Sequence, residues 1–245
     1  MKIETALRPA NWLDGLNRSA RVDGIVPAGF EGYLRIFHKA RPAEAEEPGT
    51  GAAPHARWED VASALGRRLS PETRWADLSG AYGEPVSAPG VGTVYPPEEG
   101  RLDTAGFRAL ARVLARESNG PLLAAFWTGW DPISADSEAA SAIRRGDTVV
   151  IQGEQYVLYS FEGGELADGS WMGAAAFGWA EGNGLTPNYM WPADSSWCLG
   201  TNIDLDSSIL GGPARVLSEV ESLPELEALR VTSSTDLASS APKAR

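Results

Sequence analysis

The stretch from Pro187 to Asp206 constrains the fold most, because it combines a strand pattern with many polar groups. From position 197 onward, larger and mostly apolar residues alternate with small or polar ones, as in a strand with one buried and one open face. The buried face would carry Trp197, Leu199, Thr201, Ile203 and Leu205, and the open face Cys198, Gly200, Asn202, Asp204 and Asp206. The pattern therefore predicts one strand over residues 197–206, with a site or solvent on its polar face.

Other segments show strand and helix patterns at intervals along the chain. Aromatic and β-branched runs predict strands at residues 30–38, 122–130, 148–151 and 156–161, and an edge strand within 224–231. Apolar residues at helical spacing predict helices at residues 57–65, 104–117 and 214–222. Segments rich in glycine and proline, at residues 41–55, 79–100 and 163–186, are expected to form loops.

Strands in several sequence neighbourhoods, with helices between them, predict an α+β fold. We expect a single domain over residues 1–231, built from a mixed or antiparallel β-sheet with helices packed on it. The remaining residues, 232–245, are mainly serine, threonine and alanine. They offer little to bury, so we expect a disordered tail.

The formal net charge of −12 at pH 7 limits the class of partner. Binding to a nucleic-acid backbone draws its affinity from cationic side chains that release counterions. We therefore expect no nucleic-acid partner and favour a basic protein instead. The alternative is that the acidic surface serves solubility alone.

The single cysteine, Cys198, excludes a disulfide or a cysteine-based zinc site within this chain. We expect a buried and inert thiol, because the two histidines, His38 and His55, lie far from it in the sequence. The chain shows no secretory signal and no apolar run of about 20 residues, so we expect a cytoplasmic protein without a membrane span. We expect no metal or cofactor, since no nucleotide-binding, metal-binding or nucleophile motif is present.

Two carboxylates and an amide stand close together near the end of the predicted strand. Asp204 and Asp206 would share one strand face with Cα atoms roughly 6.6 Å apart, and Asn202 would precede them. Carboxylate and amide oxygens suit a divalent cation, and a pair of carboxylates suits the acid and base of glycoside hydrolysis. The simpler alternative is a solvated turn, which acidic residues before two glycines often form.

Two tryptophans are candidates for recognition. Trp191 lies between Pro187 and Pro192, which hold it in a stiff extended path beside Asp194, and rigid aromatic rings suit binding surfaces. Trp171 stands in the glycine-rich segment 163–186, where an aromatic ring would gain by covering something. The alternative for each is burial in the core. The candidate binding residues are Trp191, Asp194, Asn202, Asp204, Asp206 and Trp171.

Three segments together resemble a family of proteins from high-GC Gram-positive bacteria that has no assigned activity. They are VPAGFEGY at residues 26–33, WPADSSWC at 191–198 and TNIDLDSS at 201–208, the last two of which contain the pattern WPxDxxWCxxTxIDLDS. The resemblance covers most of residues 26–230 and implies kinship but no chemistry. The chain departs from the family pattern at Ser196, where arginine is expected, and in its longer segment 163–186. An ion pair made by that arginine would be absent here.

Two functions fit these observations. The first is a non-enzymatic cytosolic binding protein, of the immunity or antitoxin type, that engages a protein partner through an acidic, tryptophan-rich surface. The second is a small-molecule enzyme of hydrolase type, in which Asp204 and Asp206 act beside an aromatic pocket of Trp191 and Trp171. We favour the first, because the net charge is strongly negative and no catalytic signature is present.

Overall fold

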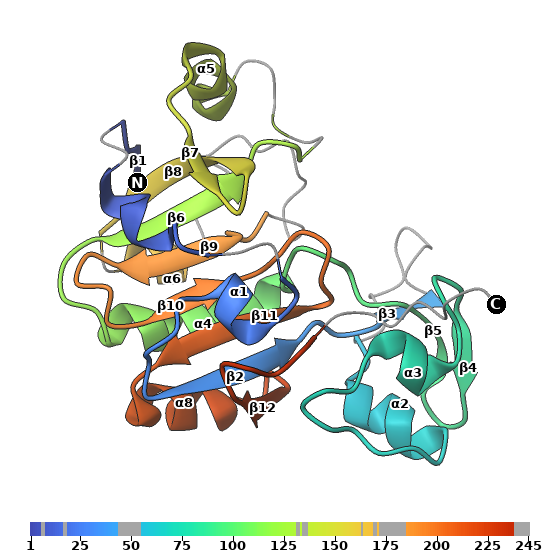
Figure 1. Cartoon of the computed structure of the whole chain (residues 1–245). Coiled ribbons are helices and arrows are strands. Elements are labelled where there is room, and N and C mark those ends of the chain that lie inside the picture. The colour runs from blue at the N-terminus through green and yellow to red at the C-terminus, as the bar shows by residue number, and fades with distance from the viewer. Residues whose placement is uncertain are drawn as a thin grey trace.

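The computed structural model describes residues 1–5, 8–16, 19–43, 55–130, 133, 137–162, 164–168, 171 and 185–237. Within these residues, helices pack on β-sheets in an α+β arrangement (Figure 1). All strand pairings described are antiparallel. The predicted fold class is therefore confirmed, in its antiparallel form.

Among the described residues, the larger of two sheets contains nine strands. They follow the order β1-β8-β6-β9-β10-β11-β2-β12, and β7 pairs with β8. Their bounds are β1 (Lys2–Ile3), β2 (Gly32–Phe37), β6 (Leu122–Trp127), β7 (Val149–Ile151), β8 (Glu154–Phe161), β9 (Tyr189–Pro192), β10 (Cys198–Gly200), β11 (Ser207–Gly212) and β12 (Ala228–Val231). Strand β2 lies between β11 and β12, so segments from the two ends of the chain share one core.

Helices cover both faces of the larger sheet (Figure 1). Helices α4 (Thr104–Arg116), α6 (Glu165–Asp168) and α8 (Ala214–Glu221) pack on one face. The 3-10 helix η1 (Arg8–Leu13) and α1 (Val22–Ile25) pack on the other, and α5 (Glu138–Arg145) contacts β1 and β8. Because both faces are covered, central strand β6 is buried on both alternations, as its apolar sequence predicts.

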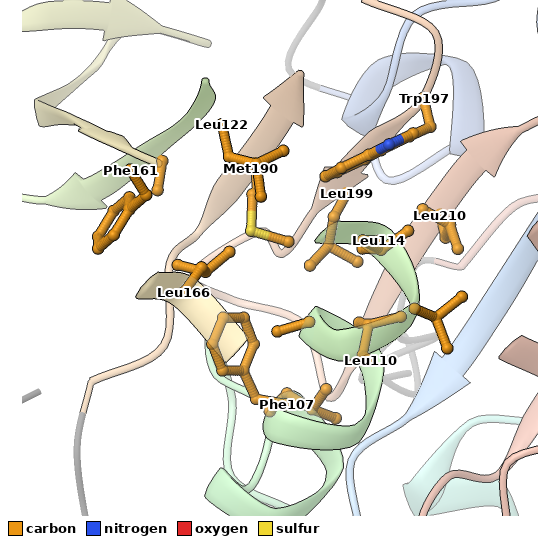
Figure 2. Close-up of a cluster of buried hydrophobic side chains, with 14 of the residues drawn as sticks. Phe107, Leu110, Leu114, Leu122, Phe161, Leu166, Met190, Trp197, Leu199 and Leu210 are labelled. Carbon is orange, nitrogen blue, oxygen red and sulfur yellow. The ribbon is translucent and has the colours of Figure 1, made fainter. Parts of the chain in front are cut away.

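Helix α4 shows how the sequence builds the core. Asp103 is its N-cap and accepts a hydrogen bond of 2.9 Å from the backbone N–H of Gly106. Figure 2 shows Phe107, Leu110 and Leu114, at helical spacing, pointing toward side chains of β9, β10 and β11. Burying each such side chain contributes about 1.5–3 kcal/mol. The predicted helix over residues 104–117 is confirmed, together with its cap.

A small lobe packs against one end of the larger sheet (Figure 1, lower right). It contains α2 (Trp58–Ala64), α3 (Trp75–Ser79) and a three-stranded sheet of β3 (Arg41–Pro42), β5 (Gly92–Tyr95) and β4 (Val86–Ala88). The ring of Phe37, from β2, lies 4.8 Å from that of Trp58, which lies 5.3 Å from that of Trp75. The lobe therefore shares its core with the larger sheet.

The predicted loops are only partly loops. Within residues 79–100, β4 and β5 form a hairpin, and residues 41–42 form β3. The strands predicted at residues 148–151 and 156–161 are β7 and β8, and β8 begins earlier than predicted, at Glu154. Gln152 and Gly153, which join them, both adopt positive φ, 53° and 81°, as a two-residue type I′ turn requires. Most of the remaining predicted loop residues, 44–54, 163, 169–170 and 172–184, lie outside the described part of the chain.

The predicted strand over residues 197–206 is wrong. Strand β10 ends at Gly200, the chain turns over residues 201–206, and β11 returns antiparallel with Leu199 opposite Leu210. The side-chain oxygen of Asn202 accepts a 2.9 Å hydrogen bond from the backbone N–H of Asp204, and this Asx turn redirects the chain. The alternation of apolar and polar residues beyond Gly200 therefore does not reflect a strand.

The prediction of a disordered tail is wrong for residues 232–237. The backbone N–H of Val22 donates to the carbonyl of Thr235 at 3.0 Å, and that of Leu237 donates to the carbonyl of Ala20 at 2.9 Å. Leu237 is also buried in the cluster beneath α1. The boundary predicted at residue 231 is too early, because local composition carries no record of these distant contacts. Residues 238–245 lie outside the described part.

Arg35 of β2 joins the larger sheet to the small lobe. Its side chain is 1% exposed. Its guanidinium donates to the carbonyl oxygens of Pro71 (3.0 Å) and Thr73 (2.7 Å), and to Ser207 Oγ (2.9 Å). It also pairs with Asp206 at 3.2 Å. A buried charge is tolerated only with such a full set of partners.

Replacing Arg35 with leucine is expected to lower the free energy of unfolding by about 3 kcal/mol. Removal of one partner leaves the other charge poorly compensated and frees the carbonyls of the lobe. Urea denaturation followed by tryptophan fluorescence measures this change. Arg112→Leu is the matched control, because Arg112 is exposed, and its cost should stay within about 0.5 kcal/mol. Equal costs for the two variants would contradict the role given to Arg35.

Candidate binding site

The two candidate tryptophans do not form a pocket with the aspartates. Trp191 is 1% exposed and lies on the α1 face of the sheet, edge-on to Trp12 at 6.2 Å. Trp171 is 3% exposed and lies in the cluster on the opposite face, beside Phe107. The expected aromatic pocket of Trp191 and Trp171 is therefore wrong, because the sheet separates them. Both tryptophans are instead buried in the core, which is the alternative given for each of them in the sequence analysis.

Asp194 also stands apart from the other carboxylates. It is exposed in the turn between β9 and β10, where its carboxylate accepts a 3.1 Å hydrogen bond from the backbone N–H of Ser196. Ser195 adopts φ of 54° in the same turn. The visible contact of Asp194 is thus that of a turn former. Its role in binding stays a prediction.

The loop at residues 201–206 brings the other three candidates together. Asn202, Asp204 and Asp206 all lie in it, and it separates two cavities. The first, which we call the acidic cavity, has a volume of about 210 Å³ and includes Asp204 and Asp206 in its wall. The second cavity has about 220 Å³ and includes Asn202 and Asp204. Asp204 and Leu205 belong to both walls, and we call these two residues the ridge.

Glu99 is a third carboxylate of the acidic cavity, and no sequence signal singles it out. It comes from the loop that follows β5, about a hundred positions before the aspartates. Burial raises its pKa, and the negative charges of Asp206 and Asp204 raise it further. The three carboxylates therefore repel one another across a short distance.

A glycine and a buried asparagine hold the two loops together. The backbone N–H of Gly100 donates to the carbonyl of Leu205 at 2.9 Å. A Cβ at Gly100 would lie 2.9 Å from the carbonyl oxygen of Ile203, and its φ of +77° also favours glycine. The side-chain nitrogen of Asn188 donates to the carbonyls of Gly100 (3.1 Å) and Thr201 (3.3 Å). The position of Glu99 beside Asp204 is thus built by the backbone.

Asp206 differs from Glu99 and Asp204, because it has a resident cation. Its carboxylate pairs with Arg35 at 3.2 Å. Burial raises the pKa of Asp206, while the Arg35 guanidinium and the backbone N–H of Trp75 oppose that shift. Within the described part of the chain, Glu99 and Asp204 have no ion-pair partner. The open negative charge of the cavity therefore resides on Glu99 and Asp204.

A buried hydrogen-bonded chain lies behind the site. His38 Nδ1 lies 2.7 Å from the carbonyl oxygen of Glu98, which can only accept, so Nδ1 carries the proton. Nε2 then accepts from Ser208 Oγ at 2.9 Å, and Ser208 Oγ accepts from Thr201 at 2.7 Å. The serine–histidine pair resembles an activated nucleophile. Ser208 is fully buried, however, so the pair is structural in this conformation.

The described residues give little support for thiol chemistry or metal binding. Burial raises the pKa of the Cys198 thiol, so a thiolate is disfavoured. Among the described residues, no group of three or more histidine, cysteine, aspartate or glutamate side chains is placed to hold a metal ion. In the same residues, no helix is both long and apolar enough to cross a bilayer.

Replacing His38 with glutamine is expected to flatten the acid side of the stability profile. Burial lowers the pKa of His38 from 6.5 to about 4. Between those values the unfolded chain binds a proton that the folded chain does not. The stability contributed by neutral His38 is therefore complete above pH 6.5 and lost as pH falls toward 4, by about 3 kcal/mol. Urea denaturation from pH 4 to pH 7 measures the slope. His55→Gln, at an exposed site, should retain most of it; an unchanged slope in His38→Gln would refute the assignment.

Replacing Asp204 with asparagine is expected to lower the pKa of Glu99, because it removes one of the negative charges that raise that pKa. Side-chain carboxyl ¹³C titration by NMR measures the shift. Glu225→Gln is the matched control, since Glu225 is exposed and absent from the walls of both cavities. A Glu99 pKa that does not move in Asp204→Asn would show that the two carboxylates do not interact.

Comparison of the chain with models of protein families, with curated proteins and with solved structures finds no match.

Proposed function

We propose that this protein binds a basic protein partner through an acidic surface centred on the loop at residues 201–206. The observation that supports it is the pair of carboxylates, Glu99 and Asp204, in the wall of the acidic cavity without an ion-pair partner in the described chain. Burial raises the pKa of Glu99 most, and the charges of Asp206 and Asp204 raise it further; a cation placed beside Glu99 and Asp204 would offset that repulsion. Binding energy is therefore available to a positively charged group.

The overall charge supports the same proposal. A net charge of −12 attracts a cationic partner over a distance and speeds encounter. Binding of the immunity or antitoxin type, to a basic protein in the cytoplasm, fits this charge. The proposed kinship with the bacterial family, tested by none of the comparisons, adds no chemistry to it.

The tryptophan part of the expected surface is not retained. Trp58, Trp75, Trp171, Trp191 and Trp197 are buried, and Trp12, Trp127 and Trp130 are partly buried, while Trp179 lies outside the described part. The exposed aromatic ring beside the carboxylates is Tyr82, which is 66% exposed and lines the acidic cavity. The proposed surface is thus acidic with a tyrosine at its rim.

A hydrolase is a second candidate, favoured by one observation. Burial raises the pKa of both Glu99 and Asp206, but of the two only Asp206 has a cation, Arg35, that opposes the shift. An acid that holds its proton next to an ionised carboxylate is the pairing used to cleave glycosidic bonds. In this reading, Glu99 donates the proton and Asp206 or Asp204 serves as the base or nucleophile.

The double variant Glu99→Gln/Asp204→Asn is expected to lose the basic partner. The tagged protein is used to capture proteins from native lysate, and a captured basic protein is then purified and titrated calorimetrically against each variant. Affinity should fall at least tenfold, and the wild-type affinity should fall steeply with added salt.

Asp14→Asn/Glu225→Gln is the control for this experiment, because it removes the same charge at exposed positions outside both cavities. Equal losses in the two double variants would reduce the site to net charge and refute the proposal. Hydrolysis of a glycoside panel, abolished by Glu99→Gln with a loss of the acidic limb of the pH profile, would favour the second candidate instead.

A further inference from the structure

The acidic cavity and the second cavity lie on either side of one narrow ridge. Asp204 and Leu205 belong to both walls. We propose that the two cavities bind one peptide segment of a partner protein, which places a lysine or arginine side chain in each cavity and crosses the ridge between them. This inference rests on the proposed binding function and specifies the chemistry of the partner.

The sizes of the cavities support a shared ligand. Their volumes are about 210 Å³ and 220 Å³, and each is smaller than the roughly 300–1,000 Å³ typical of a small-molecule pocket. Each has room for a single side chain. Together they reach the range of a pocket, but the ridge divides that space, so a ligand that fills both cavities must cross Asp204 and Leu205.

Both cavities contain groups that bind cations. In the acidic cavity, Glu99 and Asp204 have no ion-pair partner among the described residues, and Tyr82 offers an exposed ring on which a guanidinium can stack. The same wall contains three carboxylates, of Glu99, Asp204 and Asp206, and one guanidinium, of Arg74. Arg35, which is not part of the wall, pairs with Asp206. The net charge of the cavity wall is therefore negative.

The second cavity is polar in a different way. Glu154 and Asp204 supply carboxylates to its wall, and Gln152 and Asn202 supply amide oxygens. The two amides are already joined by a 3.0 Å hydrogen bond, and Gln152 also donates to the carbonyl of Gly24. Each amide oxygen already accepts one hydrogen bond, from Asn202 Nδ2 or from the backbone N–H of Asp204, and has a second lone pair for a cationic donor.

The exposed ring of Tyr82 favours a guanidinium of a protein over an amine of a free polyamine. Tyr82 is 66% exposed and belongs to the wall of the acidic cavity. A planar guanidinium stacks on such a ring and also pairs with a carboxylate through two hydrogen bonds, which an ammonium group cannot do.

The test uses three fluorescent peptides of ten residues, otherwise made of glycine and serine. One carries two arginines separated by a single residue, because residues i and i+2 of an extended chain lie on one side, roughly 6.6 Å apart. The second carries the same two arginines at its opposite ends, and the third carries one arginine. The peptide with neighbouring arginines is expected to bind the full chain at least tenfold more tightly than either other peptide. Equal binding of the two doubly charged peptides would overturn the inference.

Single variants identify the two cavities. Glu99→Gln and Glu154→Gln are each expected to remove most of the tenfold preference, because each disables one cavity, while Glu225→Gln should leave it intact. Glutamine at position 154 keeps an oxygen for Trp127 Nε1, which now donates to Glu154 at 3.3 Å, so folding should persist. Loss in Glu99→Gln with full retention in Glu154→Gln would overturn the two-cavity inference and leave the proposed function standing.

Two further outcomes separate the explanations. Spermidine, which is cationic but carries no guanidinium, is expected to bind at least tenfold more weakly than the peptide with neighbouring arginines; equal binding would overturn the peptide assignment. If none of the peptides binds and the calorimetric test also detects no basic partner, the proposed function fails together with the inference drawn from it.

Discussion

The buried guanidinium of Arg35 is the interaction on which the arrangement of the candidate site depends. It lies where β2, β11, the loop at residues 201–206 and the small lobe meet, and it binds a group from each of the last three. The rings of Phe37 and Trp58 lie 4.5 Å and 5.6 Å from it, as a cation–π contact requires. A lysine has one donor centre and could not satisfy these directions together. The acidic cavity therefore has a defined shape, since its walls come from the parts that Arg35 joins.

Several other acidic residues stabilise the fold by accepting hydrogen bonds at helix N-termini. Helices α2 and α8 begin without a side-chain cap from their own N-cap residues, Arg57 and Pro213. Glu227 accepts hydrogen bonds from the first backbone N–H groups of α2, at 2.6 Å and 2.9 Å, and Glu31 accepts one at 2.6 Å from that of α8. Carboxylates at these ends are favoured by the helix dipole. Part of the net charge of −12 therefore serves the fold, whereas the side chains of Glu99 and Asp204 cap no helix in the part of the chain that the structure describes.

The elements with strong local signals are those that the sequence predicts well. Helix α4 has a cap and an apolar stripe, β6 is apolar on both faces, and β2 lies within its expected range. The short elements α3, β4 and β5 carry too few residues for a period to be visible. The failure at residues 197–206 has another cause, because an Asx turn at Asn202 needs one side-chain hydrogen bond and leaves the alternating pattern unchanged. The candidate site shows the same contrast. The spacing of Asp204 and Asp206 marks them in the sequence, whereas no local pattern of residues marks Glu99.

The sequence by itself determined the α+β class, the apolar faces of the main helices and strands, and the acidic character of the loop at residues 201–206. Periodicity and composition suffice for these features, because they depend on whether a residue faces water or core. Only the tertiary structure decided that Trp191 and Trp171 lie on opposite faces of the sheet, that His38 is enclosed beside Ser208, and that Glu99 meets Asp204. These are contacts between segments far apart in the chain. Their geometry depends on how the strands are ordered in the sheet, which no local pattern of residues specifies.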